Sequence, residues 1–129
     1  MPAREPSPPG FDFRRQRRLL RKRDYDRVFR KARRSNSAAF TVLARAQQSA
    51  GLARLGLAVS KKVDKRAVAR NRLKRQARET FRRHAVRHLP VDIIVIARPR
   101  ASRMARADLG AELNQHWERL LGLFAATES

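Results

Sequence analysis

The sequence predicts an α+β fold, in which helices pack on a small mixed β-sheet. Three segments show apolar residues at helical spacing, and three others show the alternating or continuous apolar pattern of strands. Their order is helix, strand, strand, helix, strand, helix, which is typical of helices built onto one sheet. The chain has 129 residues, enough for one domain, which we expect to span residues 19–125.

Residues 1–18 are expected to form a flexible segment outside this domain. Prolines stand at positions 2, 6, 8 and 9, and basic residues follow, with Phe11 and Phe13 as the large apolar side chains. Such a composition cannot bury enough apolar surface to order the chain. It also lacks the apolar stretch of a secretory signal.

The first helix is predicted over residues 21–33. Tyr25, Val28 and Phe29 fall at i, i+3 and i+4, which places them on one face.

Two strands are predicted next, over residues 39–46 and 54–60, because apolar residues alternate there. The connection, 47–53, contains Gly51 and has the length of a hairpin loop. We therefore expect the two strands to pair antiparallel.

The second half of the domain should hold a helix over residues 66–88, a strand over 91–97 and a last helix over 105–124. Pro90 is expected to end the first of these helices. The strand is β-branched and almost continuously apolar, as expected when both of its faces are covered. The last helix carries a predicted core stripe of Leu109, Leu113, Trp117, Leu120, Leu121 and Phe124.

The charge of the chain indicates a polyanionic partner. Lysine and arginine number 32 against 11 acidic residues, a formal net charge of +21. Nucleic acid is the first candidate, because each phosphate contact releases counterions. An anionic membrane surface is the alternative, but the basic residues are not confined to one amphipathic segment. No apolar run approaches the roughly 20 residues of a membrane span, and the chain has no cysteine. We expect a cytoplasmic protein with no membrane partner.

The densest basic segment, residues 60–75, leaves a predicted strand and enters a predicted helix. Lys61 and Lys62 stand close to the helix start, where backbone N–H groups also attract phosphate. The alternative is an ordinary solvated helix face. The scarcity of acids argues against it, since Glu79 is the only one between Asp64 and Asp92.

Aromatic residues beside basic ones, such as Tyr25 and Phe29, suit a platform on which single-stranded bases stack. The alternative is that Phe29 only holds the first helix to the sheet. His84 and His88 have the i, i+4 spacing of a metal pair but no nearby carboxylate or thiolate, so we expect no metal. Scattered carboxylates predict no catalytic residues, which disfavours a self-sufficient nuclease.

Three motifs resemble the protein component of bacterial ribonuclease P. They are the run LGLAVSKK at 55–62, the run RNRLKR at 70–75 and the run DIIVIAR at 92–98. The resemblance covers residues 13–121. It implies a ribonuclease P subunit that assists endonucleolytic removal of the 5′ leader from precursor tRNA. A ribosomal protein or RNA chaperone has the same basic α+β design, and the Arg-Asn-Arg run disfavours it; a DNA-binding module would need a dimer seam that is not visible.

The resemblance also implies a fold. It is an αβββαβα sandwich with about four strands and a left-handed βαβ crossover, as in the second domain of ribosomal protein S5. The residues themselves indicate only three strands. A fourth near residues 35–38, or a split of the second strand, would reconcile the count.

Site residues follow from the resemblance in two groups. The catalytic RNA is expected to bind Lys61, Lys62, Arg66, Arg70, Asn71, Arg72, Lys74 and Arg75. The 5′ leader is expected to bind Phe13, Tyr25, Phe29, Phe40, Val42, Ser60 and Arg98.

The chemistry implied by the resemblance belongs to the RNA subunit, which uses Mg²⁺ to hydrolyse the phosphodiester. The partners are then the ribonuclease P catalytic RNA and precursor tRNA, with no protein partner required. We expect no cofactor held by the protein, and the loop 47–53, which has no carboxylate, is not expected to bind metal.

Overall fold

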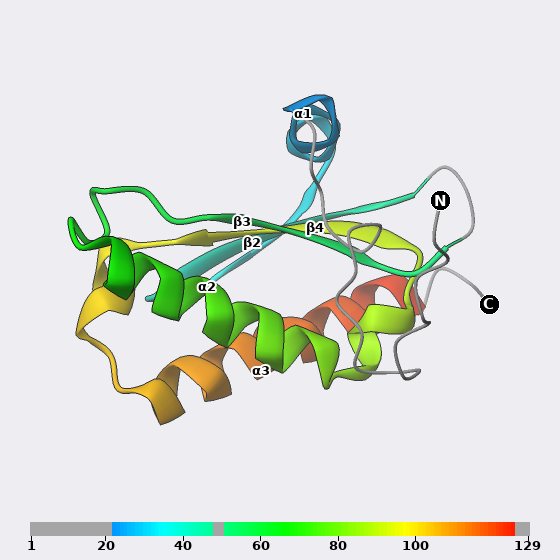
Figure 1. Cartoon of the computed structure of the whole chain (residues 1–129). Coiled ribbons are helices and arrows are strands. Elements are labelled where there is room, and N and C mark those ends of the chain that lie inside the picture. The colour runs from blue at the N-terminus through cyan, green and yellow to red at the C-terminus, as the bar shows by residue number, and fades with distance from the viewer. Residues whose placement is uncertain (1–21, 48–50, 126–129) are drawn as a thin grey trace, which may run out of the picture.

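The computed structural model describes residues 22–47 and 51–125, so the expected flexible segment 1–18 and Phe13 lie outside the described residues. The elements follow the αβββαβα order, with two short 3₁₀ helices between them (Figure 1). They are α1 (Lys22–Arg30), β1 (Arg33–Asn36), β2 (Phe40–Ala46), β3 (Arg54–Ala58), α2 (Ala67–Arg82), η2 (Ala85–His88), β4 (Val91–Ala97), η3 (Pro99–Arg103) and α3 (Arg106–Ala125).

The strand order is β1-β2-β4-β3, which makes the expected hairpin between β2 and β3 wrong. β4 lies between them, antiparallel to β2 and parallel to β3. The physical reason is the apolar character of β4, which suits a central strand with neighbours on both sides. The loop after β2 is tied to the chain before β4 instead: the N–H of Gln47 bonds the Pro90 carbonyl at 2.8 Å and that of Ala53 bonds the Arg87 carbonyl at 3.0 Å.

The two faces of the sheet are covered differently. Figure 1 shows α2 and α3 together on one face and α1 alone on the other. Side chains alternate between the faces along each strand. Phe40, Ile93 and Leu55 belong to the large core under α2 and α3, whereas Leu43 and Ile94 belong to a small cluster with Val28 of α1.

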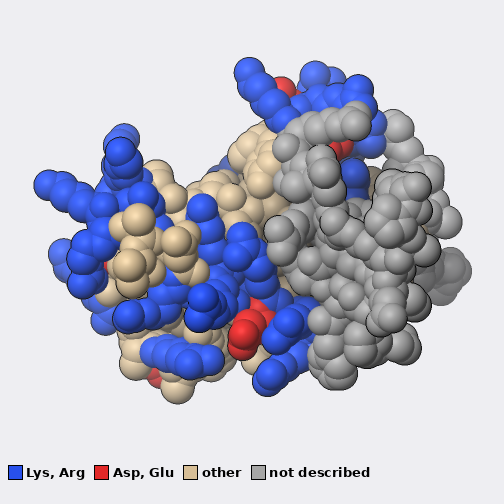
Figure 2. All heavy atoms as spheres, viewed as in Figure 1, with Lys and Arg blue, Asp and Glu red and all other residues tan. Residues whose placement is uncertain are grey.

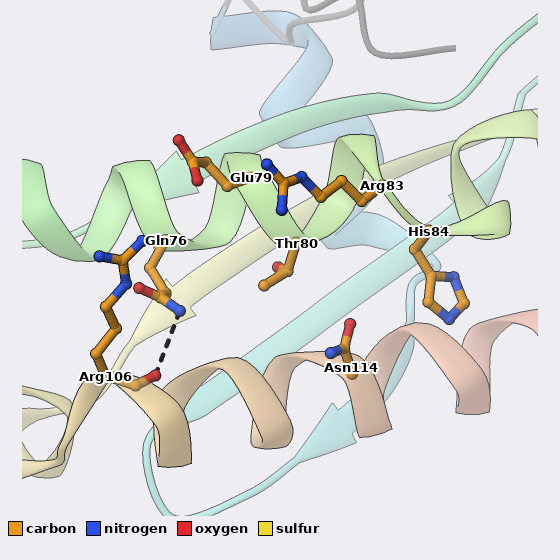
Figure 3. A pocket seen from close by; sticks show the side chains of 7 residues that line it. All are labelled: Gln76, Glu79, Thr80, Arg83, His84, Arg106 and Asn114. Carbon is orange, nitrogen blue, oxygen red and sulfur yellow. Dashed lines mark hydrogen bonds between the residues drawn. The ribbon is translucent and has the colours of Figure 1, made fainter.

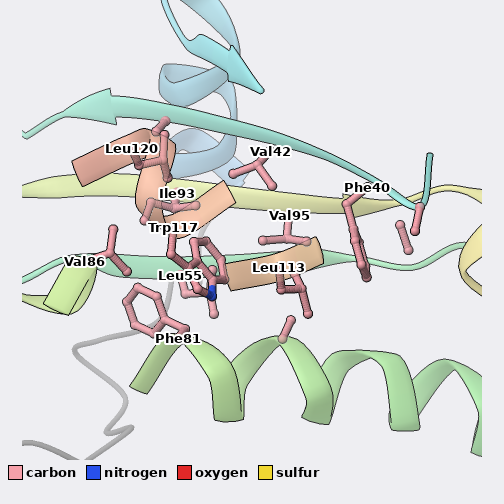
Figure 4. Packing of buried hydrophobic residues seen from close by; sticks show 14 of the residues in the cluster. Phe40, Val42, Leu55, Phe81, Val86, Ile93, Val95, Leu113, Trp117 and Leu120 are labelled. Atoms are coloured by element: carbon pink, nitrogen blue, oxygen red, sulfur yellow. The ribbon is translucent and has the colours of Figure 1, made fainter. Parts of the chain in front are cut away.

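The predicted core stripe of α3 is confirmed. Leu109, Leu113, Trp117 and Leu120 are buried, and Leu121 and Phe124 pack against the same core. Trp117 meets the ring of Phe81 edge-on, with ring centroids 5.7 Å apart (Figure 4).

The boundaries differ from prediction at α1, at α2 and at β3, which ends at Ala58 rather than at residue 60. α2 ends at Arg82 rather than continuing to His88, because His84 turns to an extended conformation and its ring accepts a hydrogen bond from the Val86 N–H, which starts η2. The first helix ends at Arg30, and the fourth strand, β1 at Arg33–Asn36, overlaps the first of the two places considered for it. In the described part of the chain no helix is long and apolar enough to span a membrane.

A buried histidine joins α3 to β1. His116 is 1% exposed, and its two ring nitrogens bond the hydroxyls of Ser35 at 2.7 Å and Ser37 at 2.8 Å. Arg119 donates to the Ser35 hydroxyl from one turn further along α3. Burial, and then the charge of Arg119, lowers the pKa of His116 to about 4, against the opposing effect of Glu112.

This histidine should make stability depend on pH. In the unfolded chain its pKa is about 6.5, so below that pH protons bind the unfolded state first and favour it. Stability should be level above pH 7 and fall by about 2 kcal/mol by pH 5 from this group alone. Urea unfolding at both pH values measures it, with His116→Asn as the comparison. An equal pH dependence in both proteins would contradict the assignment.

Candidate nucleic-acid interface

The loop between β3 and α2 is fixed by one carboxylate. Asp64 accepts hydrogen bonds from the Arg66 backbone N–H at 3.0 Å and from two nitrogens of the Arg66 guanidinium at 3.2 Å. The hydrogen bond from the Arg66 side chain has the largest effect in lowering the pKa of Asp64, and the bond from the Arg66 backbone N–H has the next largest. Val63 is buried beneath the loop, and its N–H bonds the Ser60 carbonyl at 3.0 Å. The backbone that carries Lys61 and Lys62 is therefore held in place.

Arg70 braces the same loop from α2. Its guanidinium donates to the backbone carbonyls of Asp64 at 3.1 Å and Lys65 at 2.9 Å. Of the basic residues expected here, Arg66 and Arg70 thus make intramolecular bonds that shape the loop. Lys74 is half-buried. The other basic residues expected here, Lys61, Lys62, Arg72 and Arg75, are exposed to solvent.

The exposed part of this group forms the basic surface, defined here as Lys61, Lys62, Asn71, Arg72 and Arg75. Among the described residues, none of these side chains has a hydrogen-bond or ion-pair partner. The buried positions of α2 lie on its other side. Lysine and arginine side chains gather over this region in Figure 2. An unpaired basic face is typical of phosphate binding.

The second part of the interface lies on the opposite face of the sheet, at α1. Val28 is fully buried against Leu43 and Ile94. The ring of Tyr25 lies on β3 so closely that a Cβ at Gly56 would be 2.8 Å from its Cζ atom. Only glycine leaves room for the ring at this position.

Polar bonds hold α1 over the sheet at two points. Arg54 on β3 makes a two-point ion pair with Asp92, at 2.8 Å for each bond, and lies 3.7 Å from Asp24 of α1. The hydrogen bonds that Arg54 donates to the Asp92 carboxylate raise the pKa of Arg54. The Arg45 guanidinium donates to the Arg27 carbonyl at 2.7 Å, which satisfies an acceptor in the last turn of α1.

We call the remainder of this face, the part of the sheet surface beside α1, the groove. Thr41, Ile96 and Ala58 lie side by side across three strands, and each is partly exposed. Phe29 is 51% exposed, so about half of its surface is open to contact with another molecule. The exposed residues Ser60 and Arg98 follow the ends of β3 and β4. Tyr25 and Phe29 therefore belong to the helix on this side of the sheet, and Ser60 and Arg98 lie at the end of the sheet where the parallel strands β3 and β4 finish.

Phe40 and Val42 do not belong to this groove. They are 1% and 0% exposed, and they lie in the core under α2 and α3. Because side chains alternate along a strand, the β2 residues that face α1 are Thr41, Leu43 and Arg45. Thr41 was not among the residues expected on this face, although a polar residue in the middle of an apolar strand is a signal for an open position.

His84 and His88 serve different roles despite their spacing. The His84 ring, besides starting η2, bonds Glu118 of α3, and His88 is exposed. Within residues 22–47 and 51–125, no three His, Asp or Glu side chains stand together as metal ligands.

Comparison with known proteins identifies the family. Residues 13–121 match the family described as Ribonuclease P. The chain belongs to this family. A ribonuclease P protein component from Thioalkalivibrio sulfidiphilus is 45% identical over 108 residues, covering 84% of this chain and 89% of that protein. One from Legionella pneumophila is 43% identical over 115 residues, with 88% and 97% covered.

Solved structures agree with the fold. The Staphylococcus aureus RNase P protein superposes with a TM-score of 0.74 at 32% identity, over 84% of this chain and 97% of that one. The Thermotoga maritima RNase P protein gives 0.62 at 33% identity, over 83% and 94%. The chain is therefore a subunit of ribonuclease P, the endoribonuclease that processes the 5′ end of tRNA.

The contact between Tyr25 and Gly56 can be tested by substitution. Gly56→Ala should destabilise the protein by about 1–3 kcal/mol, because the ring of Tyr25 must move. Gly122→Ala, where a Cβ meets nothing within 4 Å, is the control and should stabilise α3 slightly. Thermal unfolding followed by Trp117 fluorescence measures both. In a Tyr25→Ala background the cost of Gly56→Ala should vanish, and an unchanged cost would contradict the proposed contact.

Proposed function

We propose that the basic surface of α2 docks this protein on the catalytic RNA of ribonuclease P. The supporting observation is that Arg72, Arg75 and their neighbours are exposed and unpaired, on a helix whose entry loop is already fixed by Asp64. Little ordering of the loop then remains to be done on binding, so more of the phosphate attraction contributes to affinity.

Two kinds of basic residue share this task. Arg66 and Arg70 shape the loop through bonds to Asp64 and to backbone carbonyls. Arg72 and Arg75 have guanidinium groups available to grip phosphate with two hydrogen bonds. Asn71, which directly precedes Arg72, has an amide that can donate to and accept from a ribose hydroxyl.

The groove beside α1 is proposed to hold the single-stranded 5′ leader of precursor tRNA. Tyr25 and Phe29 supply faces for base stacking. Arg98, whose guanidinium donates to the Ser37 carbonyl at 3.0 Å, supplies positive charge at the far end. Stacking and phosphate contacts accept most sequences, so little base specificity is expected.

The hydrolytic step is assigned to the RNA subunit, whose Mg²⁺ ions supply the chemistry of water activation. The protein contributes leader binding and screens the repulsion between two RNAs. Its effect should therefore be greatest at low Mg²⁺. We place this activity in the cytoplasm.

Reconstitution tests this proposal. A bacterial ribonuclease P RNA is incubated with a precursor tRNA at low Mg²⁺, with and without the protein. We expect 5′ cleavage to require both components. Arg72→Ala/Arg75→Ala should bind the RNA roughly 30-fold more weakly, since each lost charge-assisted bond costs about 1 kcal/mol or more.

Arg33→Ala/Arg34→Ala provides the control for charge. It removes two exposed arginines from β1, the sheet edge opposite β3, and should leave affinity for the RNA subunit almost unchanged. Cleavage by the protein alone would show that the catalytic residues were missed. RNA binding without any gain in cleavage would favour a ribosomal or chaperone role.

A further inference from the structure

A cleft of about 330 Å³ opens between α2 and α3, on the side of the sheet opposite α1. Figure 3 shows Gln76 and Thr80 pointing from α2 toward α3, and Arg106 reaching from the start of α3 toward α2. The lining is completed by Glu79, Arg83, His84 and Asn114. Neither the basic surface nor the leader groove includes these residues.

The walls of the cleft are fixed by hydrogen bonds between the two helices. The Gln76 amide donates to the Arg106 carbonyl at 3.3 Å, and the Trp117 indole N–H donates to the Thr80 hydroxyl at 3.1 Å. Gly110 permits this approach, because a Cβ there would stand 3.1 Å from the Gln76 nitrogen. The cleft is therefore formed before any ligand arrives, which limits the entropy cost of binding.

The charges of the lining select an anion. Within the described residues, the guanidinium groups of Arg83 and Arg106 and the amide of Asn114 have no hydrogen-bond or ion-pair partner. Glu79 lies 3.7 Å from Arg82, which offsets its charge. Two free guanidinium groups and an amide suit a ligand with several acceptor oxygens, of which phosphate is the best match.

The lining contains no exposed aromatic ring to stack on a base, since Trp117 is fully buried beneath it. The recognised group is then a backbone phosphate rather than a nucleobase. Position indicates an RNA chain: Gln76 follows Arg72 by one helical turn, so the cleft continues the basic surface along α2.

We propose that the cleft between α2 and α3 binds a backbone phosphate of the catalytic RNA, as a second contact beyond the basic surface. This inference rests on the proposed docking of that RNA on α2. Arg83 and Arg106 clamp the phosphate oxygens, and Asn114 donates a further hydrogen bond.

A matched pair of substitutions tests the site. Asn114→Asp places a carboxylate in the cleft, whereas Gln115→Glu makes the same charge change at the neighbouring exposed residue, which does not line it. Binding of a bacterial ribonuclease P RNA is measured as a function of salt concentration. We expect Asn114→Asp to weaken binding by roughly tenfold and Gln115→Glu to have little effect. Thermal unfolding confirms that both variants fold.

A second variant, Arg83→Ala/Arg106→Ala, removes the clamp. It should make the plot of log affinity against log salt concentration less steep, by the amount expected for the loss of about one phosphate contact. It should also expose one short RNA segment in hydroxyl-radical footprints, distinct from the segment exposed by Arg72→Ala/Arg75→Ala.

The possible outcomes distinguish failure of the cleft as a phosphate site from failure of the proposed docking of the catalytic RNA on α2. If the unaltered protein neither binds the RNA nor raises cleavage, the proposed function fails and this contact with it. If it does both, but Asn114→Asp matches Gln115→Glu, or the footprint is unchanged in the clamp variant, the cleft is not a phosphate site while the docking on α2 stands.

Discussion

The ion pair between Arg54 and Asp92 is the interaction on which the centre of the sheet, and the α1 face that we propose binds the leader, depend. Asp92 is 2% exposed, at the start of a strand that is otherwise apolar, so its charge requires a close partner. Arg54 supplies it across the parallel pair of β3 and β4, and Gln47 donates to the same carboxylate at 3.0 Å. The pair thus joins β3, β4 and the loop after β2, and Arg54 also approaches Asp24 of α1.

This pair also restricts where α1 can lie. Because Asp24 and Tyr25 meet β3, and Arg45 of β2 bonds the last turn, α1 crosses one end of the sheet face and leaves the other end open. The open end is the groove proposed for the leader. The opposite face is filled by the core under α2 and α3, which turns the polar side of α2 outward. A four-stranded sheet thereby separates two surfaces that we propose bind two different RNAs.

The sequence predicted the positions of the helices and strands better than it predicted which of them lie side by side. The strand over residues 91–97 and the core stripe of α3 were located because local periodicity reports burial directly. The pairing of β2 with β3 was wrong because a short connection does not exclude insertion of a later strand. The same limit explains why Phe40 and Val42 were expected in the groove but lie in the core on the other face. Alternation showed which side chains share a face, but not which face α1 covers. The bond from Arg54 to Asp92 spans 38 positions, and no local pattern reports it.

The basic surface was easier to predict than the groove. A run of cations with few acidic neighbours is visible in the sequence, and the family resemblance added which of them are expected to bind RNA. The structure then divided that run into Arg66 and Arg70, which shape the loop, and Arg72 and Arg75, which remain available. Sequence does not show that division, because it depends on where the carbonyls of Asp64 and Lys65 point.

The most direct test of two separate RNA-binding faces is to map each face onto its RNA. The chain has no cysteine, so one introduced at either surface can carry a hydroxyl-radical-generating probe without interference. We would use Val68→Cys, at a position 71% exposed in the first turn of α2, and Thr41→Cys in the groove, each assembled with the catalytic RNA and precursor tRNA. We expect the probe at position 68 to cut the catalytic RNA and the probe at position 41 to cut the 5′ leader. Cutting of the leader from position 68, with none from position 41, would contradict this expectation.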